Sequence, residues 1–306
     1  MVRRVIVSTV EWVIRKPKLE ENLKEALTVI DKIGPQKPDI LCFPENFLAA
    51  GMPRKRAADI ANPIPGPITD KIGEKTREYG MYVIFPMIES DGEKFYNTAA
   101  LIDRKGRVVG KYRKIHPTIE EAKRGITPGK DEKVFETDFG KIGIIICFDV
   151  YYPRVVESMV RKGAEIIFFP AAFPAQSYLR AIAWQYAVNV VSSIRGPGSQ
   201  IIDITGRVIA QGSYTWFGLP PVISAELNLD RKRFEEDFNI KKVPAIWKKY
   251  GRKVEINLFR PEGALVIASN SEDVSLDDII KEFQLEPFIQ YIDRSERELK
   301  KMFESD

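Results

Sequence analysis

The chain of 306 residues has little cysteine and almost no histidine: Cys42, Cys147 and His116 are the complete set. Two cysteines are too few for a disulfide framework and are typical of a reducing compartment, so we expect a cytoplasmic protein. A single histidine excludes the zinc sites built from several histidines and the HExxH metalloproteases. The commonest metal-dependent hydrolases are therefore excluded as functions of this chain.

Long apolar runs and charge of one sign are also missing. The longest apolar stretches, residues 141–148 and 165–170, are well short of the roughly 20 residues that cross a bilayer, so we expect no contact with a membrane. The 47 basic and 43 acidic residues are mixed along the chain, and no basic stripe for nucleic acid stands out. Residues 1–10 favour a first strand over a signal peptide. Abundant Lys and Glu fit a heat-loving source.

Three common catalytic signatures are absent: the GxSxG elbow, the phosphate-binding GxxxxGK[ST] loop, and GxGxxG after a strand. Their absence removes support for a serine hydrolase, a phosphate-loop ATPase and a dinucleotide-dependent enzyme. Because no histidine base is assured, a cysteine nucleophile would need a carboxylate as its proton acceptor.

What is present is an alternation of apolar runs and amphipathic stretches, which predicts strands and helices in turn. In the first half these are a strand at residues 5–10, a helix at about 17–33, a strand at 40–43, a helix at 68–79 and a strand at 82–85. Two hairpins follow, and the strand and helix order resumes from residue 152. This order predicts an α/β fold in which helices cover mixed sheets, and the two halves could pack sheet on sheet.

The domain organisation follows from the missing linkers. No segment rich in Gly, Ser or Pro divides the chain before about residue 268, so we expect one domain at residues 1–268. Residues 269–306 are charged with a helical pattern of apolar positions, which is typical of an arm that docks or mediates oligomerisation.

The sharpest local feature is a cysteine at the end of the buried strand predicted at residues 141–147, directly before a helix. Unpaired N–H groups at the start of a helix favour a thiolate and can hold an oxyanion. The alternative, of comparable weight, is that Cys147 is a small apolar residue closing its strand.

Two charged residues also follow predicted strands. Glu45 comes after an apolar strand and Pro44, at a sheet rim where burial can raise a carboxyl pKa toward that of a general base. A solvated loop carboxylate is the commoner case. Lys114 ends the second strand of a hairpin, and an inward lysine there needs a carboxylate partner or developing negative charge to hold. A solvent-facing basic edge strand is again the commoner outcome.

The three windows together, in this order, resemble the nitrilase superfamily of carbon–nitrogen hydrolases. There, a Glu after a strand and Pro, a Lys in an Arg-Lys-x-His stretch and a Cys followed by an aromatic and an acidic residue form a triad, matched here by Glu45, Lys114 and Cys147. Residues 169–173 and 199–206 resemble the family's pocket loop and late hairpin. The resemblance implies a four-layer α-β-β-α sandwich of two mixed sheets and no metal or organic cofactor.

The resemblance also implies roles. Glu45 would take the thiol proton, and Cys147 would attack the substrate carbon to form a thioester that water hydrolyses. Lys114 and the backbone N–H of Phe148 would hold the oxyanion. The family also has a second glutamate, which orients the substrate and supports the lysine. Glu120 and Glu121 are the candidates for it here, and we choose Glu121.

The window after the cysteine bears on the substrate. Phe148-Asp149 resembles the amidase and carbamoylase branches, whereas members that act on nitriles tend to have Trp-Glu. We therefore expect hydrolysis of a small amide with release of ammonia or amine; N-carbamoyl amino acids are the first alternative and nitriles the next. Candidate substrate-binding aromatics, each equally explained by packing, are Phe47, Phe148, Tyr151 and Phe173.

Two departures from the family pattern bear on substrate preference rather than on the reaction chemistry. Arg154 stands where many members have Glu, and residues 194–198 lack the usual Asn-containing form.

An inactive binding protein of the same fold is disfavoured by the intact triad. A redox sensor would need Cys42 as resolving partner, which lies inside its own strand.

The arm and residues 263–268 resemble the part that family members use to associate, so we expect a homo-oligomer, dimer or larger.

Overall fold

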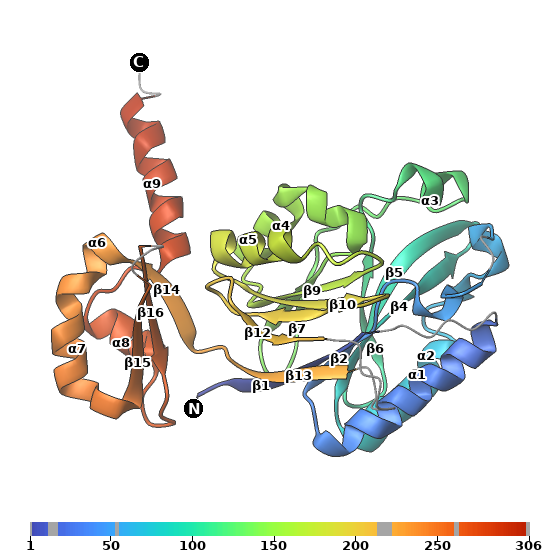
Figure 1. Ribbon diagram of the computed structural model, residues 1–306. Helices are drawn as coiled ribbons and strands as arrows, with labels where there is room; N and C mark the ends of the chain where they lie inside the picture. Colours follow the sequence, from blue (N-terminus) through green and yellow to red (C-terminus); the bar gives the residue numbers. More distant parts are fainter. Residues whose placement is uncertain (1, 12–17, 53–54, 213–221, 260–262, 304–306) are drawn as a thin grey trace.

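Two mixed β-sheets lie face to face with helices on their outer sides, and a third, smaller sheet lies apart from them (Figure 1). The computed structural model describes residues 2–11, 18–52, 55–212, 222–259 and 263–303. Within this part, no helix is long and apolar enough to cross a membrane.

The first sheet holds the N-terminal strands. Its order is β13 (Val222–Asn228), β1 (Arg4–Val10), β2 (Ile40–Cys42), β4 (Tyr82–Asp91), β5 (Lys94–Ile102) and β6 (Val108–Arg113), with β3 (Asn62–Pro63) beside β4. Strands β1, β2 and β4 run parallel, and the others on the main path pair antiparallel. Parallel pairs need crossover helices, which α1 and α2 supply.

Helices α1 (Leu19–Ile33) and α2 (Pro67–Tyr79) cover the outer face of this sheet. The apolar side chains of α1 recur at helical spacing and face the sheet, and Gly34 follows its end. Residue 17, where we expected this helix to begin, lies outside the described residues. In α2, Pro67 occupies the first turn and Gly80 ends the helix in the left-handed conformation, with φ 67°.

The second sheet repeats this plan. Its order is β12 (Val208–Gln211), β11 (Gln200–Ile202), β10 (Asn189–Ile194), β9 (Ile166–Ala171), β8 (Lys141–Ile144) and β7 (Val134–Glu136). The parallel strands β8, β9 and β10 lie at its centre, and the outer face is covered by α4 (Pro153–Arg161) and α5 (Gln176–Tyr186). One apolar cluster joins inward side chains of both sheets, so the predicted four-layer sandwich is confirmed.

Residues 231–259 and 263–303 form what we call the C-terminal module. Its sheet has the order β14 (Arg231–Glu235), β16 (Ala264–Ser269) and β15 (Val254–Phe259). Its helices are α6 (Glu236–Asn239), α7 (Val243–Tyr250), α8 (Leu276–Glu282) and α9 (Phe288–Phe303). A separate apolar core contains residues from both sides of the boundary we expected after residue 268, for example Leu265 and Ile279. The division there stays a prediction.

Helix α9 extends away from the rest of the molecule (Figure 1). It is amphipathic, and none of its residues is buried. Its exposed apolar side chains are Ile292, Leu299, Met302 and Phe303. Near its start, Asp293 and Glu296 form ion pairs with Arg161 of α4.

Short segments complete the described chain. They are α3 (Ile119–Lys123) and the 3₁₀ turns η1 (Gly34–Gln36), η2 (Phe47–Ala49), η3 (Ala57–Asp59), η4 (Cys147–Tyr151), η5 (Ile240–Lys242) and η6 (Gly251–Lys253). Three of them, η2, α3 and η4, carry residues of the cavity described next.

Candidate active site

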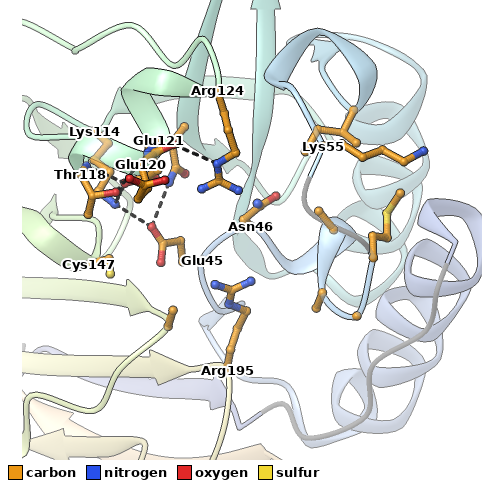
Figure 2. A pocket seen from close by; sticks show the side chains of 17 residues that line it. Glu45, Asn46, Lys55, Lys114, Thr118, Glu120, Glu121, Arg124, Cys147 and Arg195 are labelled. Carbon is orange, nitrogen blue, oxygen red and sulfur yellow. Dashed lines mark hydrogen bonds and ion pairs between the residues drawn. The ribbon is translucent and has the colours of Figure 1, made fainter.

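Three segments that follow strands bring Glu45, Lys114 and Cys147 into one cavity of about 600 Å³ (Figure 2). Glu45 comes three residues after β2, Lys114 directly follows β6, and Cys147 opens η4 just beyond β8. Strand ends are held by the sheet while their side chains project past its edge, which suits a site that needs fixed geometry.

Lys114 lies between two carboxylates at the base of this cavity. Its Nζ donates to Glu45 Oε1 at 2.9 Å and to Glu121 Oε2 at 2.7 Å. Asn97, on β5, donates from Nδ2 to both carboxylates, each at 2.9 Å. Glu45, Asn97, Lys114 and Glu121 thus form a closed ring of hydrogen bonds, which we call the buried charge cluster.

The charges of this cluster stabilise each other. Lys114 is only 1% exposed, and although burial alone would lower its pKa, the charges of Glu45, of the Cys147 thiolate when it forms and of Glu121 raise it. Burial alone would raise the pKa of Glu121, but the charge and hydrogen bond of Lys114 lower it. Lys114 and Glu121 are therefore an ion pair at neutral pH.

Cys147 adopts the left-handed backbone conformation, with φ 49°. Non-glycine residues rarely take this conformation, and the strain of such positions concentrates at functional sites. The turn directs the side chain into the cavity, beside Glu45 (Figure 2).

The environment of the thiol keeps it protonated at rest. Burial raises the pKa of Cys147, and the charge of Glu45 and a hydrogen bond with its side chain raise it further. The charge of Lys114 and the backbone N–H of Ala172 oppose this, with less effect. The thiol therefore needs a proton acceptor when it reacts, and Glu45 is in contact with it.

Asp149 connects the segment that carries Lys114 with the turn that carries Cys147. Its fully buried carboxylate accepts hydrogen bonds from the backbone N–H of His116 at 2.8 Å and of Ile146 at 3.1 Å. It also accepts one from the Tyr112 hydroxyl at 2.8 Å, and the His116 Nδ1 lies 3.1 Å away. Asp149 thus fixes the segment of Lys114 relative to the turn of Cys147.

Helix α3 places Glu121, rather than Glu120, against Lys114. Thr118 Oγ1 accepts from the Glu121 backbone N–H at 3.2 Å, and Glu121 Oε2 accepts from the Thr118 backbone N–H at 2.8 Å. This reciprocal capping box fixes the direction of the Glu121 side chain. Glu120 pairs with Lys123 at the surface instead.

The four predicted substrate-binding aromatics lie elsewhere. Phe47 is fully buried, packs edge to face on Phe43 and meets Phe85 at a tilt, in the core beneath the first sheet. Phe148 and Phe173 each pack against Tyr151, whose ring is 56% exposed. None of the four is among the described side chains that line the cavity.

Three polar residues that line the cavity were not among the candidates chosen from the sequence: Asn97, Arg124 and Arg195. Asp149 was considered there only for its bearing on the substrate, not as a residue that positions others. Asn97 offered one signal, since its amide lies among mostly apolar residues of β5. Both cysteines are free, and burial raises the pKa of Cys42 inside β2. In the described part of the chain, no group of three or more His, Cys, Asp or Glu side chains is arranged to hold a metal ion.

Known proteins resemble this chain in sequence and in fold. Residues 6–233 match the sequence model of the carbon–nitrogen hydrolase family. Omega-amidase NIT2 of Xenopus tropicalis is 29% identical over 251 residues, which cover 73% of this chain and 88% of the relative. The crystal structure of Saccharomyces cerevisiae Nit3, a member of the nitrilase superfamily, superposes with a TM-score of 0.65 at 21% identity, over 78% of this chain and 94% of that one. An amidase from Nesterenkonia sp. superposes with a TM-score of 0.64 at 19% identity, over 75% of this chain and 92% of that one.

Proposed function

Because the chain belongs to the carbon–nitrogen hydrolase family of the nitrilase superfamily, we propose that it hydrolyses the C–N bond of a small linear amide through a cysteine thioester. One observation carries the proposal: a protonated thiol on a strained turn shares a cavity with a carboxylate that contacts it and a lysine held between two carboxylates. These are the parts that acyl transfer to a thiol requires.

In the first half of the proposed reaction, Glu45 accepts the Cys147 proton as the sulfur attacks the amide carbon. The carbonyl oxygen becomes an oxyanion, held by Lys114 and by the backbone N–H of Phe148. The C–N bond then breaks, and Glu45 returns the proton to the departing nitrogen. Ammonia or amine leaves, and the acyl group remains on the sulfur.

In the second half, water replaces the nitrogen. Glu45 accepts a proton from water as its oxygen attacks the thioester carbon, and the same two donors hold the second oxyanion. The C–S bond breaks, Glu45 returns the proton to the sulfur, and the carboxylic acid leaves. Glu121 contributes by keeping Lys114 charged and in place throughout.

The preference for amides is supported by the omega-amidase, which is similar to this chain over 73% of this chain's length. Hydrolysis of N-carbamoyl amino acids and of nitriles are the alternatives within the same chemistry. An inactive binding protein of the same fold is the alternative outside it.

Ammonia release tests the proposal. Wild type, Cys147→Ala and the matched control Cys42→Ala are compared on primary amides, N-carbamoyl amino acids and nitriles. We expect wild type and Cys42→Ala to hydrolyse amides and Cys147→Ala to be inactive. Turnover by folded Cys147→Ala would refute the thiol mechanism, and folded wild type with neither turnover nor a Cys147 adduct would support the binding protein.

We further propose that the protein is a cytoplasmic homo-oligomer, dimer or larger. The exposed apolar side chains of α9, within the charged arm, support association. Light scattering at micromolar concentration should give a mass above that of one chain. A monomer would contradict this proposal and leave the chemistry untouched.

A further inference from the structure

A second cavity, of about 700 Å³, lies between the sandwich and the C-terminal module. On the sandwich side it is lined where the parallel strands β8, β9 and β10 begin, by Lys141, Glu165 and Asn189. Cys147 follows the opposite end of β8, and no described residue lines both cavities. On the module side the lining includes residues 287–290, which lie beyond the family match that ends at residue 233. The second cavity is therefore separate from the site of the proposed reaction.

The charges that line the second cavity leave one cation over. Four of its five cations have a carboxylate partner: Arg3 with Glu165, Lys141 with Glu136, Arg231 with Asp203 and Lys232 with Asp277. The fifth, Arg233, has none among the described residues, although it is only 6% exposed. Buried charges are normally paired, because taking a charge out of water is costly. The second cavity thus carries one uncompensated positive charge within the part of the chain that the structure describes.

The guanidinium of Arg233 is held in place, but one of its edges is free. The rings of Trp184 and Phe288 lie against it, with ring centres 3.6 Å and 3.9 Å from Cζ, and Nη1 donates to the Trp184 carbonyl at 2.6 Å. Nε is buried without a hydrogen-bond partner. Nη2 bonds with no described residue and is not among the fully buried atoms. Two donors on the same edge, Nε and Nη2, are therefore unsatisfied in the described structure.

Other arginines of this chain show what such an edge binds. Arg113 donates to the carboxylate of Glu89 from Nε at 2.8 Å and from Nη2 at 2.7 Å. Arg294 donates to that of Glu286 from the same two atoms, at 2.7 Å and 2.8 Å. The fixed fork of these two donors matches the two oxygens of a carboxylate. Arg233 has the same edge, and no carboxylate of the described residues occupies it.

The rest of the second cavity suits an apolar body. Apolar side chains from both sides line it, among them Ile204, Leu229, Phe288 and Ile289. A cavity of this size, with apolar walls and a few polar groups that fix orientation, is typical of a small-molecule site. A carboxylate matches the single surplus charge, whereas a phosphate group would bring a charge of about −1.5 to −2.

We propose that the second cavity binds a small organic carboxylate, with the carboxylate on the free edge of Arg233 and an apolar body against Leu229 and Ile289. Nη2 is the accessible end of this edge, and pairing with Nε as well requires a small shift of the side chains that enclose it. The ligand contacts the sandwich and the C-terminal module at once, so its binding strengthens their attachment. The inference does not depend on amide hydrolysis, because the residues of the proposed reaction line the other cavity.

Calorimetry tests the site with four probes: benzoate, benzyl alcohol as its neutral counterpart, acetate as the charge without the apolar body, and inorganic phosphate. We expect benzoate to bind wild type most tightly of the four. Arg233→Met should weaken benzoate binding about 10- to 100-fold, as expected for loss of a charge-assisted pair, and should leave benzyl alcohol nearly unchanged. Benzoate should also raise the unfolding temperature of wild type but not that of Arg233→Met.

Two further variants make the result specific. Arg207→Met is the matched control, because Arg207 also lies against a ring of the module, with its Cζ 4.1 Å from the ring centre of Phe259. It is exposed and outside the second cavity, so its loss should not change the affinity for benzoate. Arg233→Lys keeps the charge without the two-donor edge and should bind benzoate with intermediate affinity. It serves if Arg233→Met does not fold.

Three outcomes would overturn the inference: no binding of benzoate to wild type, equal binding to wild type and Arg233→Met, or tighter binding of phosphate than of benzoate. Benzoate bound in the cavity of Cys147 instead would give an affinity that Arg233→Met leaves unchanged, which is the second of these outcomes. None of them bears on the proposed function, which ammonia release tests separately.

Discussion

Two cations are buried among the residues that the structure describes, and their surroundings differ in kind. Lys114 in the cavity has two carboxylates as partners, whereas Arg233 of β14 lies between two aromatic rings. The Arg233 guanidinium carbon is 3.6 Å from the ring centre of Trp184 and 3.9 Å from that of Phe288. Its Nη1 donates to the Trp184 carbonyl at 2.6 Å, and no carboxylate pairs with it in the described structure.

The difference appears in the proton affinity of each cation. Burial lowers the pKa of Arg233 to about 10, because only the distant charge of Glu235 opposes it. At Lys114 the carboxylates reverse the effect of burial and raise the pKa. Carboxylate partners therefore keep the buried lysine charged, whereas the aromatic rings accept the buried arginine without raising its pKa.

The parts that Arg233 joins are the sandwich and the C-terminal module. Trp184 belongs to α5 of the sandwich, while Arg233 and Phe288 belong to the module. The match to the carbon–nitrogen hydrolase family ends at residue 233, so this contact lies where the family's shared segment ends. The charge of Lys114 lies in the cavity of the proposed reaction, whereas the charge of Arg233 joins two parts of the structure.

Replacing Lys114 should have the largest effect of any change to this comparison. Lys114→Met leaves Glu45 and Glu121 buried side by side without a countercharge, so we expect a loss of about 3 kcal/mol or more in unfolding free energy. Loss of the oxyanion donor should lower kcat on the order of 100- to 1000-fold. Urea unfolding and ammonia release measure the two effects. Lys123→Met, at the surface, is the control; a Lys114→Met protein as stable as this control would mean that the cluster does not hold buried charge.

Glu45→Gln should come next. It keeps the shape of the side chain but removes the proton acceptor, and loss of a general base costs on the order of 100- to 10,000-fold in rate. Because the charge of Glu45 raises the pKa of Cys147, the variant should have a lower thiol pKa than wild type. Thiolate absorbance against pH, in a Cys42→Ala background, measures it. A more ionised thiol with a slower reaction would separate proton transfer from thiol ionisation; an unchanged thiol pKa would contradict the assigned contact.

Arg233→Met should have a smaller effect and of a different type. Methionine fills the space between the rings without a charge, so the loss is limited to two cation–π contacts and one hydrogen bond, about 1 to 3 kcal/mol in total. Activity toward amides should stay within about threefold of wild type, since the site lies in another part of the molecule. Thermal unfolding and kcat/KM are the measurements. A loss of activity as large as that of Lys114→Met would erase the distinction between the two cations.

The smallest effect expected is a pH dependence. The pKa of Glu121 is lowered from its ordinary value of 4.5, so the ion pair with Lys114 stabilises the folded state above that pH. The contribution is lost as the pH falls from 4.5 through the folded pKa, because the folded carboxylate then takes up a proton. Unfolding free energy measured on either side of pH 4.5 should fall less steeply in Glu121→Gln than in wild type. Equal slopes would show that Glu121 is not the titrating group.

The sequence was informative where short patterns determine position. The strands that precede Glu45, Lys114 and Cys147 could be predicted because apolar runs end in charged or reactive residues. Glu121 could have been chosen on firmer ground, since Thr118 three residues before it makes a capping-box pattern. Asn97 could not be assigned a partner, because it meets Glu45 and Glu121 only after three distant segments fold together.

Aromatic residues and the C-terminal module show where sequence patterns fail. Phe47 follows Glu45 by two positions, yet its ring turns into the core, and ring direction depends on packing that no local pattern records. Strand β14 carries three basic residues in a row, which hides its strand character. The pairing of β14 with β16, across about thirty residues, is a contact that tertiary structure alone specifies.

Asp149 has a practical consequence for anyone who would transfer this site to another scaffold. Copying Glu45, Lys114 and Cys147 alone would reproduce three side chains but not the spacing between the lysine segment and the cysteine turn. That spacing depends on one carboxylate that binds the backbone before the cysteine and the backbone after the lysine. The smallest set of residues to transfer therefore includes a fourth, Asp149, which does not contact the substrate. A grafted site should be built from Asp149 and its two backbone hydrogen bonds outward.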